Sequence, residues 1–126
     1  MGVQVAVRRD LAERLLNYGA QTIALVNALP KTHVCFRIGD QLLRSGTAVG
    51  AHYEEAQGAE SRADFVHKLQ LALKEVRESR YWLRLLGHAR VVAGPTLAAL
   101  VDEATELRAI LSKSVATAKG TARCST

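Results

Sequence analysis

Basic side chains recur at a helical spacing in the second half of the chain. The steps between them are three or four residues, which places them on one face of a helix. Lys74, Arg77, Tyr81, Arg84 and His88 follow these steps, and Arg80 lies nearby; we call these six residues together the basic stripe. Cations along one face can bind a phosphate backbone, and an aromatic ring can stack on bases. The stripe therefore predicts a nucleic-acid interface. The alternative is an ordinary solvated helix face, on which oppositely charged residues such as Lys74 and Glu78 are neighbours.

A second apolar face lies on the same segment. Trp82 is flanked there by leucines, with two glutamates between them, away from the main hydrophobic stripe. A helix in a small monomer needs one buried face, so the second face predicts contact with another copy of the chain, anchored by tryptophan. The predicted oligomer interface consists of Leu71, Glu75, Glu78, Trp82 and Leu85, with Arg44.

The two glutamates of that face have two possible roles. As paired carboxylates, Glu75 and Glu78 could act in acid–base catalysis. As structural groups, they would pair with arginines of a neighbouring helix or subunit, such as Arg44 or Arg37. We favour the structural role.

Other candidate ligands are sparse. Asp64-x-x-His67 matches half of the carboxylate di-metal motif of helical bundles, but such sites need further glutamates and a second copy. His33-x-Cys35 supplies two ligands, fewer than a zinc site needs. His52 is interpreted as a hydrogen-bonded interior or interface histidine; the alternative is a catalytic base or a ligand.

We expect no metal, no cofactor and no enzyme activity. Serine–histidine–aspartate order, a glycine-rich phosphate loop and a CxxC pair are all missing from the sequence. A metal-dependent or hydrolytic enzyme remains the distant alternative.

Four segments have the apolar period of amphipathic helices, and no segment reads convincingly as a strand. The predicted helices span residues 10–29, 33–57, 62–88 and 95–118. Their predicted boundary residues are Asp10 with Glu13 as a capping box, Pro30, Thr32, Gly58, Ser61 with Asp64, and Pro95. Because the first two connections are short, consecutive helices must be antiparallel neighbours. The sequence predicts an all-α, up-down-up-down antiparallel four-helix bundle.

Each predicted helix has one core stripe. In chain order the stripes are Leu11, Leu15, Tyr18, Thr22, Leu25 and Leu29; Ile38, Leu42, Ser45, Val49, His52 or Tyr53, and Ala56; Phe65, Leu69, Ala72, Val76, Ser79, Leu83 and Leu86; and Leu97, Leu100, Ala104, Leu107, Leu111 and Val115. Gly39, Gly46 and Gly50 interrupt the second helix at about 1 kcal/mol each relative to alanine, which suggests close approach of another backbone.

Size and charge limit the remaining possibilities. The 126 residues suit one domain, with an N-terminal arm at 1–9, the bundle at 10–118 and a flexible tail at 119–126. The chain has 17 Lys and Arg against 12 Asp and Glu, a net charge of +5 that permits nucleic-acid binding. No apolar run is long enough to span a membrane. Two isolated cysteines and no secretory leader pattern predict a reducing, cytoplasmic location.

Longer runs of the sequence resemble a known family. They are Leu42 to Ala56 (LLRSGTAVGAHYEEA), Ser61 to Phe65 (SRADF), Ala72 to Leu83 (ALKExxExxYWL) and Glu103 to Leu111 (EAxELxxIL). This pattern is similar to the bacterial four-helix bundle proteins, also called 23S rRNA intervening-sequence proteins. The resemblance spans about residues 8–118. His52 departs from it, because many relatives have asparagine at this position.

The resemblance implies an up-down bundle that assembles into a ring, often a pentamer. A related branch, the accessory protein of diversity-generating retroelements, is a basic pentamer that binds nucleic acid and a reverse transcriptase. We therefore expect a homo-oligomer that binds RNA or DNA. The alternative is a scaffold that recruits a protein partner without nucleic acid.

Overall fold

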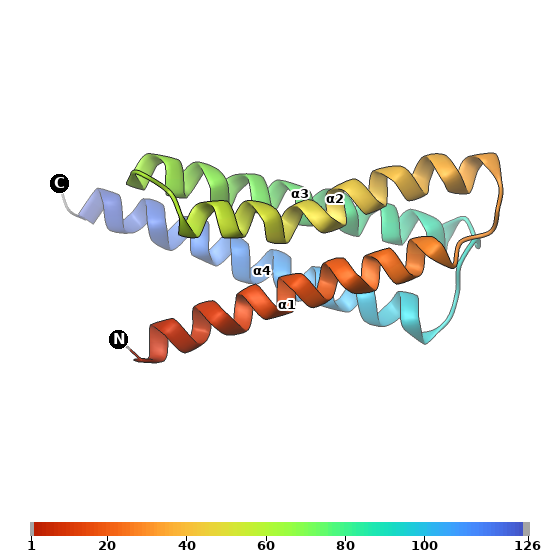
Figure 1. Cartoon of the computed structure of the whole chain (residues 1–126), viewed down its shortest axis with the longest axis horizontal. Helices are drawn as coiled ribbons and strands as arrows, with labels where there is room; N and C mark the ends of the chain where they lie inside the picture. Colours follow the sequence, from red (N-terminus) through yellow and green to blue (C-terminus); the bar gives the residue numbers. More distant parts are fainter. Residues whose placement is uncertain (1, 125–126) are drawn as a thin grey trace.

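In the computed structural model, the chain forms four long antiparallel helices (Figure 1). They are α1 (Gly2–Asn27), α2 (His33–Gln57), α3 (Arg62–His88) and α4 (Pro95–Cys124). The structure describes the backbone of residues 2–124 and the side chains of residues 10–120, and this part contains no strand. The predicted all-α four-helix bundle is confirmed.

The boundaries of the two central helices follow local capping chemistry. The Thr32 side chain accepts a hydrogen bond from the Cys35 N–H at 3.2 Å and begins α2. The Ser61 hydroxyl accepts one from the Asp64 N–H at 3.0 Å and begins α3. Gly58 follows the last residue of α2, and α4 begins at Pro95. These predicted boundaries are confirmed.

The outer ends of the bundle differ from the prediction. α1 begins at Gly2 and α4 continues to Cys124, so residues predicted as arm and tail are helical up to these positions. The capping role of Asp10 is wrong, because Asp10 lies inside α1. A potential cap permits a helix start but does not force one, and no proline interrupts residues 2–10 or 119–124. Positions 1, 125 and 126 lie outside the described residues.

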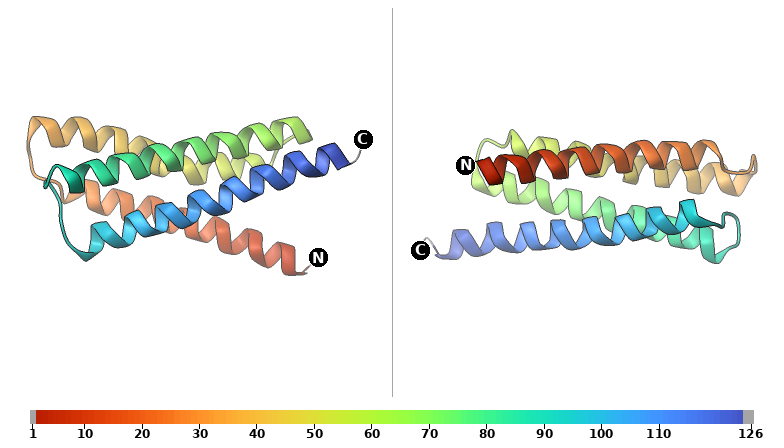
Figure 2. Two further views of the ribbon diagram at one scale, coloured as in Figure 1. Left: turned by 180° about the vertical axis from the view of Figure 1, so that it is seen from behind. Right: turned by 90° about the horizontal axis from the view of Figure 1, so that it is seen from below.

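The core lies along the common axis of the helices and contains the predicted stripes. Most of their members are buried, and only Ile38, His52 and Phe65 remain partly exposed. The packing follows chain order, α1 on α2, α2 on α3 and α3 on α4, while α1 contacts α4 least. Figure 2 shows α1 and α4 diverging toward the two chain termini.

Close approach of α1 to α2 explains the glycines in α2. A Cβ on Gly46 would lie 2.7 Å from the Thr22 Cγ2 atom, whereas a Cβ on Gly50 would meet Leu15 at 3.5 Å. Gly46 therefore permits a backbone approach that alanine would block, and the neighbour is α1 of the same chain.

Buried polar groups in the core are paired. The Tyr18 hydroxyl and the Ser79 hydroxyl share a hydrogen bond of 2.7 Å that joins α1 to α3. Burial raises the pKa of Tyr18 to about 12, although the bond with Ser79 opposes this shift. Thr22 donates to the Tyr18 carbonyl at 2.8 Å. At the rim, Arg14 of α1 pairs with Glu103 of α4 through two bonds of 2.6 and 3.1 Å.

Candidate nucleic-acid interface

The basic stripe lies on the outer surface of α3, turned away from the core. Five of its members are exposed: Lys74, Arg77, Tyr81, Arg84 and His88. The structure therefore brings the predicted residues together on one accessible face. Among the described side chains, no carboxylate lies within ion-pair distance of Arg77 or Arg84. Their charges are available to an external anion.

Arg80 differs from the rest of the stripe because it turns toward α4. It is partly buried, and its Nε donates to the Thr105 hydroxyl at 2.8 Å. Burial and the nearby positive charges of Arg108 and Arg84 lower the pKa of Arg80. Arg108 extends the basic surface onto α4, and Thr105 of the same helix holds Arg80. Sequence reasoning missed both, although each lies beside the α4 core stripe.

Tyr81 is the aromatic group of this surface. Its side chain is 56% exposed, and its ring meets the Trp82 ring edge-on, with the centroids 5.2 Å apart and the planes at 73°. This contact restrains the tyrosine ring, and its exposure leaves it accessible for stacking on a base.

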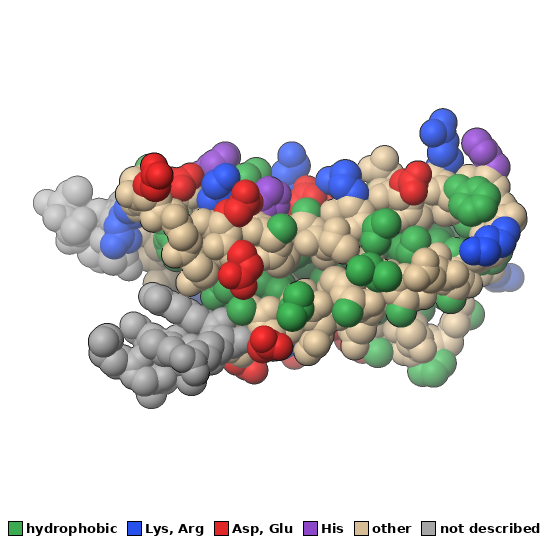
Figure 3. Space-filling view, in the orientation of Figure 1, with side chains coloured by type: hydrophobic (Ala, Val, Ile, Leu, Met, Phe, Trp, Pro, Cys, Tyr) green, Lys and Arg blue, Asp and Glu red, His purple; other side chains and the backbone are tan. Residues whose placement is uncertain are grey.

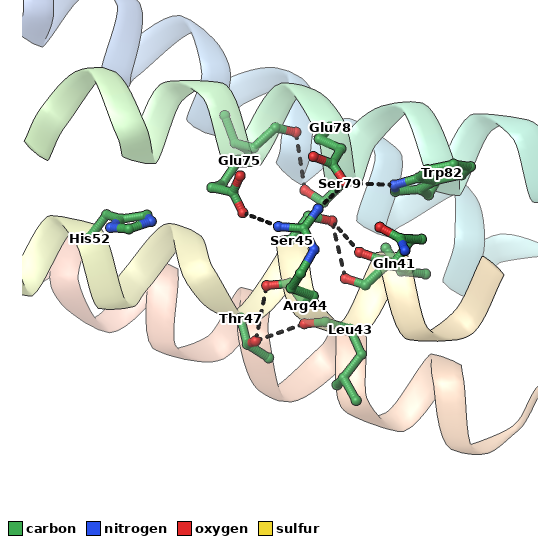
Figure 4. Close-up of polar contacts among 12 residues, drawn as sticks. Gln41, Leu43, Arg44, Ser45, Thr47, His52, Glu75, Glu78, Ser79 and Trp82 are labelled. Atoms are coloured by element: carbon green, nitrogen blue, oxygen red, sulfur yellow. Dashed lines mark hydrogen bonds and ion pairs between the residues drawn. The ribbon is translucent and has the colours of Figure 1, made fainter. Parts of the chain in front are cut away.

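The two glutamates of α3 bind an arginine of the same chain. Arg44 of α2 donates to Glu75 at 2.9 Å and also to Glu78, while Trp82 Nε1 donates to Glu78 at 3.1 Å (Figure 4). Burial opposes ionisation of Glu78, but the bonds from Trp82 and Arg44 outweigh it and lower the pKa of this carboxyl. These contacts fit the structural role proposed for the carboxylates and link α2 to α3.

Most of the chain matches a known protein family. The family model of the 23S rRNA-intervening sequence protein matches residues 11–113. The chain belongs to this family.

A solved structure supports the assignment. The chain is similar to the crystal structure of a protein with unknown function from the S23 ribosomal protein family of Bacteroides thetaiotaomicron. The two chains share 32% identity and a TM-score of 0.79, and the similarity covers 86% of this chain and 96% of that one. Among curated proteins, none matches the chain.

The other predicted interface residues of this intervening-sequence protein lie beside the ion pairs. Leu71, Trp82 and Leu85 are partly buried by their own bundle, and Glu75 is buried. Arg37, the other proposed partner of the glutamates, is exposed and takes no part in the ion pairs among the described residues. The role of the set in oligomerisation stays a prediction.

A more exposed apolar surface lies on α1 and α2, where sequence reasoning did not place one. We call it the α1–α2 apolar face: Leu16, Ile23, Phe36 and Leu43, exposed by 67, 45, 57 and 36%. The two members on each helix are seven residues apart and do not belong to the core stripes. This spacing in the sequence could have indicated a second apolar face. Figure 3 shows hydrophobic side chains gathered over these two helices.

The weak ligand motifs do not form a metal centre in the described part of the chain. No group of three or more histidine, cysteine, aspartate or glutamate side chains there is arranged to hold a metal ion. The backbone N–H of Asp64 donates to the Ser61 hydroxyl at the start of α3, and the His67 side chain is exposed. Cys35 is buried while His33 is exposed at the start of α2.

His52 lies on α2 in contact with its own helix. Its Nδ1 lies 2.7 Å from the Glu55 carboxylate, which also lies 3.9 Å from Lys68 Nζ. The hydrogen bond with His52 lowers the pKa of Glu55. His52 is therefore hydrogen-bonded as expected, but its side chain is partly exposed and not interior. A position at an interface stays a prediction.

In the described residues, none of the helices combines the length and apolar character required to cross a bilayer.

Proposed function

We propose that this intervening-sequence protein is a non-enzymatic, cytoplasmic homo-oligomer that binds RNA or DNA through the outer face of α3. The observation that carries the proposal is the exposed basic stripe, whose Arg77 and Arg84 have no carboxylate partner among the described side chains. Cations compensated within the chain, such as Arg14 and Arg44, would contribute less to binding a polyanion. Release of counterions from phosphates supplies the free energy of such binding.

Two surfaces support assembly into a ring, and we take the pentamer of related proteins as the expected size. A ring uses two different surfaces on each subunit, which meet head to tail. One candidate surface surrounds Trp82, and the other is the α1–α2 apolar face. Five chains of charge +5 would carry about +25, which would strengthen the field at the repeated basic stripes.

A pair of charge-matched variants tests nucleic-acid binding. Arg77→Gln/Arg84→Gln removes two charges from the stripe, whereas Lys31→Gln/Arg37→Gln removes two exposed charges at the α1–α2 end of the bundle. Fluorescence anisotropy of a labelled structured RNA should show weaker binding for the first variant and near-normal binding for the second. Equal affinity of both variants and the unmodified protein would overturn the proposed interface.

The alternative function is a scaffold that recruits a protein partner, with positive charge serving solubility. The exposed α1–α2 apolar face favours it, because apolar surface of this kind often marks protein contacts. A stoichiometric protein partner retained after nuclease treatment, together with absent RNA binding, would favour this alternative.

A further inference from the structure

The helices of this bundle are joined at their outer edges by arginines, and the partners of these arginines differ. Arg14 of α1 meets Glu103 of α4, and Arg44 of α2 meets Glu75 of α3. Both guanidinium charges are thereby neutralised within the chain. At the α3–α4 edge, Arg80 instead meets a neutral hydroxyl, that of Thr105. Among the side chains that the structure describes, no carboxylate forms an ion pair with the arginine of this edge.

Because α3 and α4 are antiparallel (Figure 1), two further arginines lie on either side of this contact. Arg84 lies one turn after Arg80 on α3, and Arg108 lies one turn after Thr105 on α4, so each neighbours the Arg80–Thr105 contact. The lowered pKa of Arg80, caused by burial and then by Arg108 and Arg84, reflects the same proximity. None of these three arginines has an ion-pair partner among the described residues.

Thr105 fixes the orientation of Arg80. Its hydroxyl donates to the Val101 carbonyl at 2.9 Å, so its oxygen accepts from Arg80 Nε with a lone pair in a set direction. Because Nε is engaged by the protein, the two terminal nitrogens of Arg80 remain for an external acceptor. A guanidinium held in this way loses less side-chain entropy when it binds an oxyanion.

We infer that Arg80, Arg84 and Arg108 form a clamp for one phosphate group at the α3–α4 edge, positioned by Thr105. The planar donor forks of arginine suit the oxygens of a phosphate better than a single ammonium does. The phosphate is a phosphodiester of a bound polynucleotide, and in this respect the inference rests on the proposed function. A free phosphate ion shares the same chemistry and is separated by the experiment below.

The decisive variant changes no charge. Thr105→Val keeps the size of the side chain and all three arginines, but removes the acceptor that orients Arg80. We expect the dissociation constant for labelled RNA to rise by roughly 5- to 10-fold, about the net effect of one ordinary hydrogen bond, because Thr105 acts only by orienting Arg80. Thr47→Val is the matched control, because Thr47 also donates to a carbonyl one turn back, that of Leu43, but lies on α2. Its RNA affinity should equal that of the unmodified protein.

A second variant tests the clamp independently if Thr105→Val does not fold. Arg80→Lys retains the charge but lacks the fork, and it should weaken RNA binding by a similar factor while circular dichroism shows unchanged helix content. Normal RNA affinity in both Thr105→Val and Arg80→Lys would overturn the clamp. If Arg77→Gln/Arg84→Gln weakened binding in that same case, the proposed function would stand without the clamp.

Inorganic phosphate separates the two sources of the ligand. The melting temperature should rise in phosphate relative to chloride of equal ionic strength, and Thr105→Val should abolish this rise. A phosphate-specific rise without any RNA binding would support the clamp for a free ion and overturn the nucleic-acid function. No phosphate effect together with an RNA defect in Thr105→Val would support a phosphodiester alone. If the protein shows neither RNA binding nor a phosphate effect, the clamp is wrong.

Discussion

The contact of Gly46 with α1 permits a sharp test of the packing. In Gly46→Ala, the new Cβ would lie 2.7 Å from Cγ2 and 2.9 Å from Oγ1 of Thr22. Thr22 is fully buried, and its hydroxyl is bonded to the Tyr18 carbonyl at 2.8 Å, so it cannot move freely. In Gly50→Ala, the nearest atom would be Leu15 Cβ at 3.5 Å, an ordinary contact.

The expected magnitudes follow from three contributions. Alanine in place of glycine stabilises a helix interior by about 1 kcal/mol, and this gain applies to both variants. Overpacking costs about 1–3 kcal/mol, and loss of the Thr22 hydrogen bond costs about 1 kcal/mol more, at Gly46 only. We therefore expect Gly46→Ala to lower the free energy of unfolding by about 1–3 kcal/mol and Gly50→Ala to raise it by about 1 kcal/mol.

Urea denaturation followed by circular dichroism, at one protein concentration, measures both changes. In thermal denaturation, the melting temperatures of the two variants should differ by roughly 8–16 °C, at about 4 °C per kcal/mol for a chain of this size. Thr22→Ala removes both closest atoms, so Gly46→Ala should cost little in that background. The account of the α1–α2 contact is wrong if Gly46→Ala is as stable as Gly50→Ala in the unmodified chain.

Further outcomes concern titration and assembly. The fold lowers the pKa of Glu78, so ionised Glu78 stabilises the protein above pH 4.5, the ordinary pKa of this group. This stabilisation is lost as the pH falls through the lower pKa that Glu78 has in the folded state. Glu78→Gln should remove that part of an acid-denaturation curve. Burial raises the pKa of Tyr18 from 10.0 to about 12. The free energy of unfolding should therefore fall by an amount on the order of 2–3 kcal/mol as the pH rises between these two values. Tyr18→Phe should abolish this loss of stability at alkaline pH. In light scattering, Trp82→Ala and Leu16→Ser/Ile23→Ser should each lower the native mass, because a head-to-tail contact needs both surfaces; an unchanged mass in both would contradict the proposed ring.

The sequence predicts most of the fold because the necessary signals are local. The 4-3 spacing from Leu69 to Leu86 depends only on helical periodicity, and these positions are buried in the structure. The caps at Thr32 and Ser61 involve residues three positions apart and are equally readable. The start of α1 was missed because Asp10 is compatible with both a cap and a helix interior.

The candidate site is less predictable because its parts come from different helices. The basic stripe lies on one helix, and its periodicity identifies it. The contact of Arg80 with Thr105 depends on the register of α3 against α4, which no local pattern encodes. Arg44 was predicted as a partner of Glu75 from charge alone, but whether the pair joins two helices or two subunits required the three-dimensional arrangement.

The salt dependence of RNA binding tests the central proposal most directly. Anisotropy of a labelled structured RNA should give a linear fall of log affinity with log salt, with a slope of roughly −0.7 to −0.9 for each phosphate contacted. Arg77→Gln/Arg84→Gln should reduce this slope by about 1.4–1.8 if each arginine contacts one phosphate. No binding at low salt, or a slope that this variant leaves unchanged, would contradict a nucleic-acid interface on α3.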